Sequence, residues 1–371
     1  MKKTKSNRPA APSRRFTAPT PNQIRYALLL LSVAILLVLL ALPRPGLRAR
    51  RLKPVLAPET PPPAASLERI RVATYNIENF TDARNDGPER TPERYVAQAR
   101  GAADIIAEVN PDILLLQEIE NARVLIYLNS LFQQPYDYIY VTRLRRPNGT
   151  RDRLNLGLLS RLPPRRVRQL DFHALGGPVR PARGTIAATF HLPGDFALMT
   201  YGIHLKSNFG DDARNRAHRG LALHVIGGDA VAQTYRNLPR ETAAMILGDT
   251  NVDPDTPQFA DDPSLEPLAG AFADLWLGRP IDERTTIPTR HPGETGDPDF
   301  VFPPSAFDRV FATRNLTADG PWLVGPPVSV QRGVATGCNI TPPGVNGHIS
   351  DHYLVYVDLT PNPDYTPPAE E

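Results

Sequence analysis

A carboxylate follows an apolar run in the segment LLLQEIEN, residues 114–121. The run from Ile113 to Leu116 has the composition of a strand that is buried on both faces, and Glu118 comes two residues later. An ionised carboxylate is costly to bury unless it pairs with another charge or binds a metal ion. The position of Glu118 therefore indicates a chemical role.

Other predicted strands end or begin in the same way, at an acid, an amide or an imidazole. Strand ends on one edge of a sheet converge on a common crevice, where ligands tend to bind. Together these positions favour one shared site over a set of unrelated solvated turns. They are Asn76 after RVATY, Glu118 after ILLLQ, His204 after LMTYGI, Asp249 after AMILG, Asp308 at the start of FDRVFAT, and the pair Asp351 and His352 before YLVYV.

The residue types define the chemistry that such a site could perform. Carboxylate and amide oxygens suit a hard cation such as Mg²⁺, and imidazoles transfer protons near neutral pH. A hard cation, a proton shuttle and amide donors together suit the attack of water on a phosphate ester. The oxygen donors are Asn76, Glu118, Asp249, Asn251 and Asp351, and the imidazoles are His204 and His352.

These segments resemble the motif blocks of the endonuclease/exonuclease/phosphatase superfamily, in particular its bacterial secreted or membrane-anchored nuclease-like branch. The blocks appear in chain order as ATYNIENF, LLLQEIEN, GIHLKS, LGDTNVD, FDRVF and SDHYLV. Each block alone is a weak signal, but all of them in order are specific. The resemblance implies the DNase I-like fold: a two-layer β-sandwich flanked by helices, a four-layer α/β/β/α arrangement of the α/β (α+β) class.

The resemblance also implies a metal site at the edges of the two sheets. Glu118 resembles the principal metal ligand, with Asn76 and Asp351 beside it. The expected ion is Mg²⁺, with Mn²⁺ or Ca²⁺ as alternatives.

The remaining site residues resemble catalytic residues of the superfamily. His352 matches the catalytic histidine, with Asp308 as its carboxylate partner. Asp249 and Asn251 match the Asp-x-Asn pair that positions the nucleophile and holds the phosphate. His204 matches the second histidine, which contacts the phosphate or protonates the leaving group. The residues alone leave open whether His352 or Asp249 takes the proton of the attacking water.

Basic residues near these motifs are candidates for phosphate contacts. The segment from Arg143 to Arg168 contains nine arginines and one acid, Asp152. Because arginine pairs with phosphates in two-point fashion, this segment could bind nucleic acid; the alternative is a solvated loop and strand edge. Lys206, Arg183 and Arg216 are the predicted phosphate-binding residues, and Arg214 and Arg219 could extend their surface.

The predicted metal site does not identify the substrate, because enzymes with different substrates share one fold. A nuclease that hydrolyses DNA or RNA is the favoured function, because the basic segment accompanies the complete set of motifs. A phospholipid hydrolase of the sphingomyelinase type, or a hydrolase of another small phosphoester, is the alternative. A binding module without catalytic activity is a third hypothesis, which the filled motif positions disfavour. The protein is expected to be a monomer.

The motifs lie on predicted strands and at their ends. Strands are expected at 69–75, 136–142, 154–159, 184–191, 196–204, 243–248, 307–313 and 353–359. Thr91 is expected to cap a helix that has Pro92 at its first position, and Asn110–Pro111 to stop it. A second helix is expected over 213–235. Strands and helices mixed in this way predict a sandwich of sheets covered by helices.

The chain has a basic N-terminal part and an acidic remainder. Residues 1–65 contain 12 of the 42 Lys and Arg but only one acid, Glu59, so the remaining residues have a net charge of −8. The sequence pI of about 9.0 therefore does not indicate a nucleic-acid surface on the domain. The single cysteine, Cys338, excludes both an intrachain disulfide and a cysteine-based zinc site.

Residues 26–42 form an uncharged apolar stretch of 17 residues. At roughly 25 Å as a helix it could span a bilayer, so we predict a transmembrane signal anchor, with a cleaved signal peptide and a secreted protein as the alternative. Seven Lys or Arg residues precede the stretch and five follow it up to Lys53, which favours an extracytoplasmic, periplasmic or extracellular catalytic domain.

The predicted domain boundaries follow from composition. Residues 1–25 form a basic segment ahead of the anchor. Residues 43–65 contain seven prolines from Pro43 onward and are expected to be a stiff spacer of roughly 65 Å that holds the domain off the membrane. The catalytic domain is expected over 66–360, followed by a disordered tail over 361–371.

Overall fold

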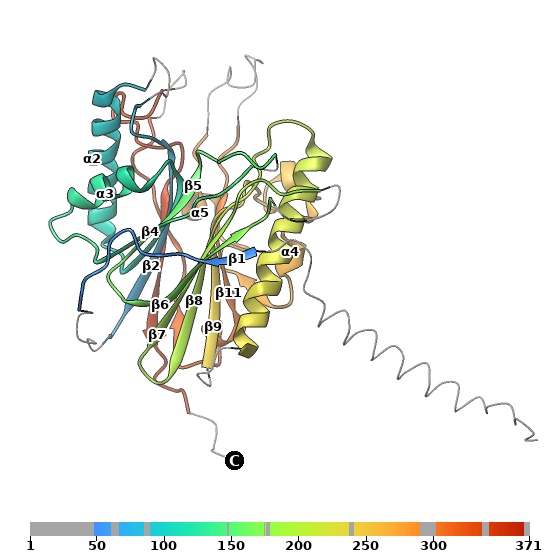
Figure 1. The fold of residues 1–371 in the computed structure, drawn as a ribbon. Helices are drawn as coiled ribbons and strands as arrows, with labels where there is room; N and C mark the ends of the chain where they lie inside the picture. Colours follow the sequence, from blue (N-terminus) through green and yellow to red (C-terminus); the bar gives the residue numbers. More distant parts are fainter. Residues whose placement is uncertain are drawn as a thin grey trace, which may run out of the picture. The chain divides into compact units, whose positions relative to one another are not determined.

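The structure is a computed structural model that describes residues 48–60, 67–84, 90–146, 148–173, 175, 179–236, 241–289, 302–335 and 341–366. Residues 46–371 form one compact unit. Within the described ranges the strands form two seven-stranded sheets, each of which is mixed (Figure 1).

Sheet A has the strand order β1-β6-β7-β8-β9-β11-β10. Its strands are β1 (Arg48–Arg51), β6 (Pro164–Asp171), β7 (Gly184–Leu192), β8 (Phe196–His204), β9 (Glu241–Asp249), β10 (Phe272–Asp274) and β11 (Asp308–Thr313). Sheet B has the order β12-β14-β2-β3-β5-β4, and β13 pairs with β14. Its strands are β2 (Ile70–Phe80), β3 (Ile113–Ile119), β4 (Tyr138–Val141), β5 (Asn155–Ser160), β12 (Trp322–Val324), β13 (Val328–Val330) and β14 (Leu354–Pro361).

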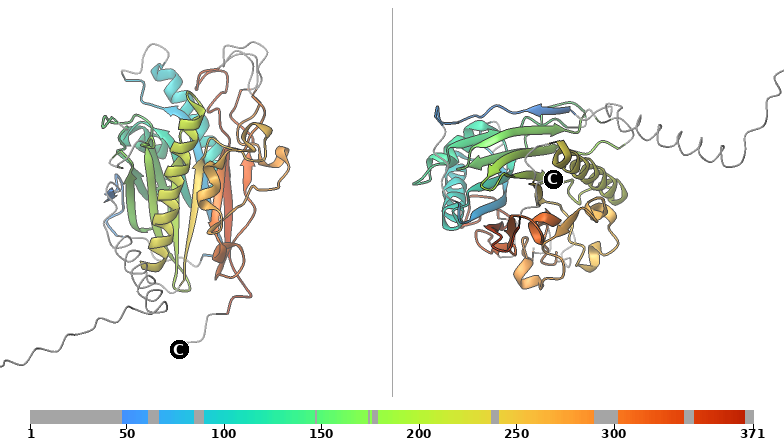
Figure 2. Two further views of the ribbon diagram at one scale, coloured as in Figure 1. Left: turned by 90° about the vertical axis from the view of Figure 1, so that its right-hand side faces the viewer. Right: turned by 90° about the horizontal axis from the view of Figure 1, so that it is seen from below.

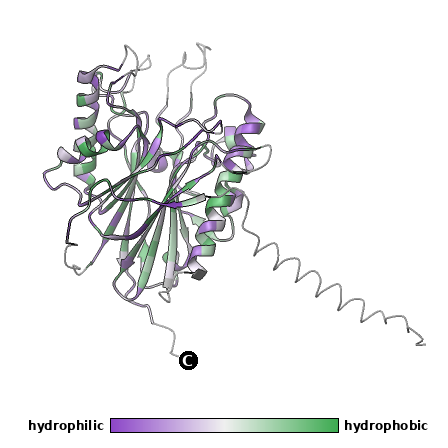
Figure 3. Ribbon diagram, viewed as in Figure 1, coloured by the Kyte–Doolittle hydropathy of each residue, from purple (hydrophilic) through white to green (hydrophobic). Residues whose placement is uncertain are grey.

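Helices cover the outer face of each sheet, as Figures 1 and 2 show. Helices α2 (Pro92–Val109) and α3 (Ala122–Ser130) pack on sheet B in one apolar cluster. Helix α4 (Asp212–Arg236) packs on sheet A in a second cluster. A third cluster fills the space between the sheets, and Figure 3 shows the apolar residues concentrated along the strands. The predicted layering of two sheets between helices is therefore confirmed.

The ends of α2 follow from local sequence. The Thr91 hydroxyl accepts a hydrogen bond from the backbone N–H of Arg94, and Pro92 occupies the first helical position, where its missing N–H costs nothing. Asn110 ends the helix in the left-handed conformation, with φ of 50°. Both ends agree with the sequence prediction.

The expected proline-rich spacer over 43–65 is partly wrong, because a described part of it belongs to the domain. Strand β1 pairs antiparallel with β6, from Arg48 opposite Asp171 to Arg51 opposite Arg168. Leu52 is buried in the core between the sheets, and the backbone of Leu56 pairs with that of Ile139. The folded domain therefore begins before residue 66.

The predicted tail also begins inside the fold. Strand β14 reaches Pro361, and the side chain of Asn362 donates a hydrogen bond to the carbonyl of Gly320. Residues 367–371 lie outside the described residues, as do the predicted basic segment 1–25 and the predicted anchor 26–42. Among the helices that the structure describes, none combines the length and the apolar character needed to cross a bilayer.

Strand register brings the predicted site residues of sheet A into one row. The parallel pair β8–β9 sets His204 opposite Asp249, and the antiparallel pair β9–β11 sets Asp249 opposite Asp308. Strand β7 begins at Gly184 in the same row, because Ile186 pairs with Gly202 on β8. Three of the predicted polar strand ends therefore share one edge.

Candidate active site

His352 and Asp308 form a buried pair at the centre of the site. The Nδ1 atom of the His352 ring lies 2.7 Å from Oδ2 of Asp308, and both residues are buried. The Ser350 hydroxyl accepts a hydrogen bond from the His352 backbone N–H and donates one to the carbonyl of Asn76. These contacts fix the ring and direct its Nε2 atom towards the residues of the neighbouring strands.

Asp249 lies where the two sheets meet. Its Oδ2 atom accepts a hydrogen bond from Nδ2 of Asn76 at 3.2 Å, and lies 3.4 Å from Nε2 of His204 and 3.9 Å from Nε2 of His352. Asp351 adds a second carboxylate, with its Oδ1 atom 3.6 Å from Nε2 of His352. Residues from β2, β8, β9 and the segment before β14 therefore converge within hydrogen-bonding or ion-pair range.

Glu118 enters the site through a bulge in β3. The pairing of β3 with β5 shifts between Leu116 and Ile119, and Glu118 adopts a φ of 62°, which is uncommon for a residue with a Cβ. Its Oε2 atom accepts a 2.6 Å hydrogen bond from the backbone N–H of Asn79, and its Oε1 atom lies 3.6 Å from Nε2 of His204. Strained backbone of this kind persists where the surrounding contacts over-determine it, commonly at functional sites.

Gly248 permits the close approach of the two sheets beside Asp249. It has a φ of 134°, and a Cβ at this position would lie 2.2 Å from the carbonyl oxygen of Ile203 and 2.9 Å from the side chain of Gln117. Gln117 in turn donates a hydrogen bond to Thr74, which ties β3 to β2 below the site. Any larger residue would displace the strand that carries Asp249.

The oxygen atoms of the site can be compared with the ligands that a hard cation such as Mg²⁺ requires. The Oδ1 atom of Asn76 is buried and has no hydrogen-bond partner, although its Nδ2 atom lies 3.5 Å from Oε1 of Glu118. An amide oxygen left unpaired beside a carboxylate fits a cation ligand, because a buried acceptor otherwise loses a hydrogen bond. Among the described residues no three side chains of the types His, Cys, Asp and Glu form a ready-made metal cage. The residues suit Mg²⁺, which usually keeps several water ligands and needs only one or two carboxylates.

The charges around His352 keep its ring protonated. Burial by itself lowers the pKa of His352, but the carboxylates of Asp308, Asp351 and Asp249 outweigh it and raise the pKa to about 10. Burial is also the main reason that the pKa of Asp249 rises to about 7, with the charge of His352 opposing the rise. In the absence of a metal ion, His352 is therefore the proton donor of the pair and Asp249 the acceptor.

His204 is neutral for the opposite reason. It is buried, and burial together with the positive charges of Arg183 and His352 lowers its pKa well below the ordinary value. Its Nδ1 atom has no hydrogen-bond partner within the described structure, while Nε2 faces Asp249 and Glu118. The two histidines thus differ in protonation state although both face Asp249.

Asn251 and Arg183 lie beside this core through shared contacts with Leu205. The backbone N–H of Asn251 donates to Oδ1 of Asp249 at 2.8 Å, and its side chain reaches the carbonyl of Leu205. The Arg183 guanidinium donates to the same carbonyl at 2.7 Å, and Arg183 adopts a φ of 65°. The structure therefore places a guanidinium and an amide on the side of Asp249 that bears His204.

Lys206 is held by its own loop. Its ammonium donates to the carbonyls of Ser207 at 2.8 Å and Phe209 at 2.9 Å, and to the Ser207 hydroxyl at 3.2 Å. Burial and the neighbouring charge of Arg183 lower its pKa. The predicted phosphate contact would require Lys206 to give up one of these hydrogen bonds.

Arg216 and Arg219 pair with carboxylates, whereas the sequence predicted that they contribute to a phosphate-binding surface. Arg216 pairs with Asp212 at 2.7 Å and with Asp262 at 3.7 Å, on the exposed side of α4. Arg219 is fully buried, pairs with Asp262 at 2.6 Å, and donates to the carbonyl of Lys206. The prediction that Arg219 extends the phosphate-binding surface is therefore wrong, because Arg219 is buried and donates a hydrogen bond to the backbone of the 206–209 loop.

The arginine-rich segment 143–168 is split between several environments. Arg168 is buried in a bidentate pair with Asp229 of α4, and Arg161 lies over the ring of Tyr136. The loop that contains Arg143 lies near the start of β7, because Leu144 packs against Gly184. Only part of the segment is therefore the solvated basic surface that the sequence suggested.

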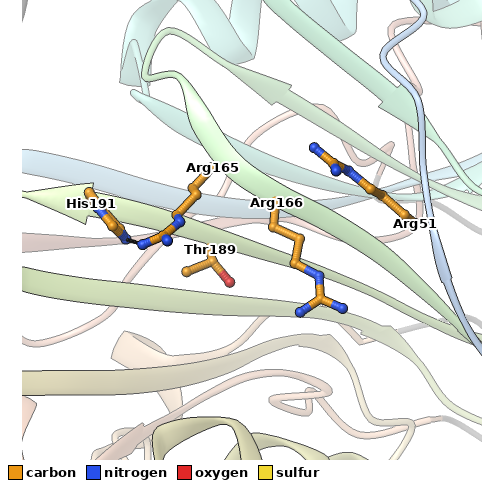
Figure 4. A pocket seen from close by; sticks show the side chains of 5 residues that line it. All are labelled: Arg51, Arg165, Arg166, Thr189 and His191. Carbon is orange, nitrogen blue, oxygen red and sulfur yellow. Dashed lines mark hydrogen bonds between the residues drawn. The ribbon is translucent and has the colours of Figure 1, made fainter. Parts of the chain in front are cut away.

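Two further arginines of this segment line a pocket away from the site. The pocket has a volume of about 350 Å³ and is lined by Arg51, Arg165, Arg166, Thr189 and His191 (Figure 4). It lies towards the end of β7 that is opposite Gly184. The predicted site residues contact one another at one edge of the two sheets, which we call the catalytic edge. The pocket is separate from this edge.

A second carboxylate–histidine pair was missed by the sequence analysis. His348 Nε2 lies 2.9 Å from Oε2 of Glu78, and its Nδ1 atom accepts a hydrogen bond from the backbone of Ala335. Burial, together with the charges of Asp351 and Glu118, raises the pKa of Glu78, although the pairing with His348 opposes the rise. The available signal was the spacing, since Glu78 follows Asn76 by two residues on one strand and so lies on the same face.

A profile of the Endonuclease/Exonuclease/phosphatase family matches residues 73–352. The chain belongs to this family. Its members are in general hydrolases of phosphoester bonds. No curated protein sequence matches the chain.

Several solved structures share the fold of this chain. TDP2 from C. elegans is similar at 16% identity and a TM-score of 0.53, covering 79% of this chain and 75% of that one. D. rerio TDP2 complexed with single strand DNA product has 17% identity and a TM-score of 0.51, covering 79% and 99%. A conserved protein of unknown function from Enterococcus faecalis has 12% identity and a TM-score of 0.52, covering 79% and 100%. At these identities the likeness shows the fold alone.

Proposed function

We propose that the protein is a divalent-metal-dependent phosphodiesterase, and that its substrate is a nucleic acid. The observation that carries the proposal is the convergence of the His352–Asp308 pair with Asp249, Asn76 and Glu118 at the junction of the two sheets. The family membership supports phosphoester hydrolysis in general. The donor set of Asn76, Glu118 and Asp351 would hold Mg²⁺, with Mn²⁺ or Ca²⁺ as alternatives, and a bound ion would neutralise charge on the phosphoryl oxygens.

The protein's own groups divide the proton chemistry between them. Oδ2 of Asp249 accepts the proton of the attacking water, since it is the acceptor of the central pair and is held by Asn76. His352, protonated and oriented by Asp308, donates a hydrogen bond from Nε2 to a phosphoryl oxygen as negative charge develops there. Of the two candidates that the sequence leaves open, His352 and Asp249, we therefore propose Asp249 as the group that accepts the proton.

Three neighbours bind and orient the phosphate. The neutral ring of His204 offers an N–H beside Asp249 and Glu118, and the Asn251 amide is held next to Asp249 by its own backbone. Arg183 supplies a positive charge on the same side, which a phosphodiester anion would offset. Holding the reacting groups in this geometry lowers the entropic cost of the attack.

Two features favour a nucleic acid over a lipid headgroup. Phe209 is 78% exposed at the tip of the loop that follows His204, and Asn208 of that loop donates to the carbonyl of Asn251. An exposed aromatic ring next to a phosphate site can stack on a nucleobase. The structure of D. rerio TDP2 complexed with single strand DNA product supports the same class of substrate within this fold.

The membrane attachment belongs to the same proposal. The apolar stretch over 26–42 would anchor the protein as a single-pass signal anchor, with the catalytic domain on the extracytoplasmic side; the alternative is secretion after cleavage. The support is the length and charge pattern of the sequence. We propose that the protein acts as a monomer.

A substrate panel tests the proposal. The full chain in detergent micelles is incubated with single-stranded DNA, RNA and phospholipid vesicles, each with Mg²⁺ and with EDTA. We expect cleavage of at least one of the polymers only with Mg²⁺. Headgroup release from vesicles without cleavage of either polymer would instead support the lipid alternative.

A further inference from the structure

A basic pocket lies on sheet A, away from the catalytic edge (Figure 4). Arg51 comes from β1, Arg165 and Arg166 from β6, and Thr189 and His191 from β7. These strands are adjacent in the sheet, so the five side chains come together through the β1–β6–β7 ladder. The pocket therefore depends on β1, which precedes the expected start of the domain.

The pocket is remote from the site described above. Strand β7 begins at Gly184, in the row of the sheet that contains His204, and His191 lies seven residues further along. At about 3.3 Å per residue this is a separation of roughly 23 Å. A ligand that touches the metal ligands cannot also fill this pocket unless it is a polymer.

The arginines of the pocket lack acidic partners. Within the described residues, no carboxylate pairs with Arg51, Arg165 or Arg166, whereas Arg168 on the same strand pairs with Asp229. Asp195, in the turn after β7, is the acid whose charge reaches His191. All three arginines are exposed at the pocket, and a bound anion would offset the positive charge that they bring there.

Most of the side chains that line the pocket can donate hydrogen bonds. Arg165 donates to Nε2 of His191 at 2.7 Å, so this ring is an acceptor on that side. Burial, followed by the charge of Arg165, lowers the pKa of His191, which agrees with a neutral ring that orients the guanidinium. Figure 4 shows Arg166 and Thr189 next to this pair, and Arg51 beyond Arg166 on the side away from His191.

We propose that this pocket binds the phosphate group of a ligand, as a second anion site separate from the catalytic one. Guanidinium forks match phosphate oxygens in two-point geometry, and the Thr189 hydroxyl supplies a further donor. At about 350 Å³ the pocket can also hold part of the group that bears the phosphate. The phosphate could belong to a small phosphate ester or to the backbone of a polynucleotide, because both present the same group.

Calorimetric titration of the full chain with pyrophosphate tests this proposal. The titration is made in detergent micelles with EDTA, so that no metal ion attracts the anion to the carboxylates of the catalytic edge. We expect pyrophosphate to bind, and the Arg165→Gln/Arg166→Gln variant to bind it about tenfold more weakly or worse. The matched control is Arg100→Gln/Arg314→Gln, which removes two exposed charges from α2 and from the short helix α6 (Arg314–Thr317) and is expected to bind like the parent.

The outcomes separate this site from the proposed catalytic function, because the titration involves no turnover. Equal binding by the two double variants, or no binding by the parent protein, would overturn the proposal. Displacement of pyrophosphate by a short single-stranded oligonucleotide would identify a polymer backbone as the source of the phosphate. Binding of pyrophosphate without such displacement would identify a small ester. Thermal melting of each variant checks that it is folded.

Discussion

At the scale of single residues, the proposed mechanism depends on the protonation states of His352 and Asp249. Both are buried, with Nε2 of His352 lying 3.9 Å from Oδ2 of Asp249, yet His352 is the donor because three carboxylates surround it. His204, equally buried but beside Arg183, is neutral. Environment rather than residue type therefore assigns the roles of the two histidines.

Glu118 is the residue on which the proposed metal site depends most. Replacing Glu118 with Gln keeps the shape of the side chain but removes its charge, so we expect a lower affinity for Mg²⁺ and a rate that extra Mg²⁺ partly restores. The measurement is the rate as a function of Mg²⁺ concentration. Glu93→Gln, at the exposed start of α2, is the control, and an unchanged metal dependence of Glu118→Gln would argue against this ligand.

Phe209 is a proposed substrate contact that was not predicted from the sequence. Removing its exposed ring by Phe209→Ala is expected to raise KM for single-stranded DNA by roughly tenfold, the size of one lost base-stacking contact, and to leave kcat nearly unchanged. Leu277→Ala, which removes another exposed apolar side chain, should leave KM as it is. A substrate with an abasic residue next to the scissile bond should be insensitive to the Phe209 change.

At the scale of elements, the strands that carry the site were predictable because each is an apolar run that stops at a polar residue. Strand β6 was not, since its sequence PRRVRQLD contains three arginines, and only the buried pairing of Arg168 with Asp229 makes it suitable for the interior of a sheet. Strand β1, with the sequence RARR, was read as part of a spacer for the same reason. The Glu118 bulge was also beyond prediction, because it arises from pairing with β5 rather than from local sequence.

The packing of the segment after β1 gives a stability prediction. Leu52 is buried between the sheets, so Leu52→Ala should lower the free energy of unfolding by about 2 kcal/mol or more. Leu56 is 46% exposed, so Leu56→Ala should change the free energy of unfolding little. Chemical denaturation measures both. Equal stabilities of the two variants would show that the segment 48–56 behaves as a free linker.

The buried pair of Asp262 and Arg219, next to the 206–209 loop, predicts how the stability of the protein depends on pH. Burial by itself raises the pKa of Asp262, but the hydrogen bonds of Ser264 and the charge of Arg219 more than offset this and lower it below the ordinary value. Because the pKa is lower in the folded state, this carboxylate stabilises the protein above its unfolded pKa of about 3.9, and the contribution is lost as the pH falls through the folded value.

Asp262→Asn should therefore lower the free energy of unfolding by about 3–5 kcal/mol at neutral pH, because it leaves the buried Arg219 without its partner. The difference from the parent should shrink as the pH falls below about 4. Denaturation curves at several pH values measure it. Asp319→Asn, which breaks an exposed pair with Arg314, is the control and should have little effect at any pH.

At the scale of the whole molecule, the two sheets divide the site between them. Asn76 and Glu118 belong to sheet B, while His204, Asp249 and Asp308 belong to sheet A. No one sheet holds both a proposed metal ligand and the proposed proton acceptor, so the packing of the sheets is what assembles the chemistry. The family resemblance could be predicted from the motif order, whereas this division required the topology.

The hydrolysis of bis(4-nitrophenyl) phosphate, a small diester that needs no nucleic-acid contacts, tests whether the protein cleaves phosphodiesters with a metal ion and His352. The full chain and its His352→Ala variant are compared with Mg²⁺ and with EDTA. We expect turnover only with Mg²⁺, and a loss of about 10²–10⁴-fold in the variant without loss of folding. Turnover by the parent in EDTA would contradict the proposed metal dependence, and an undiminished rate for His352→Ala would contradict the proposed role of His352.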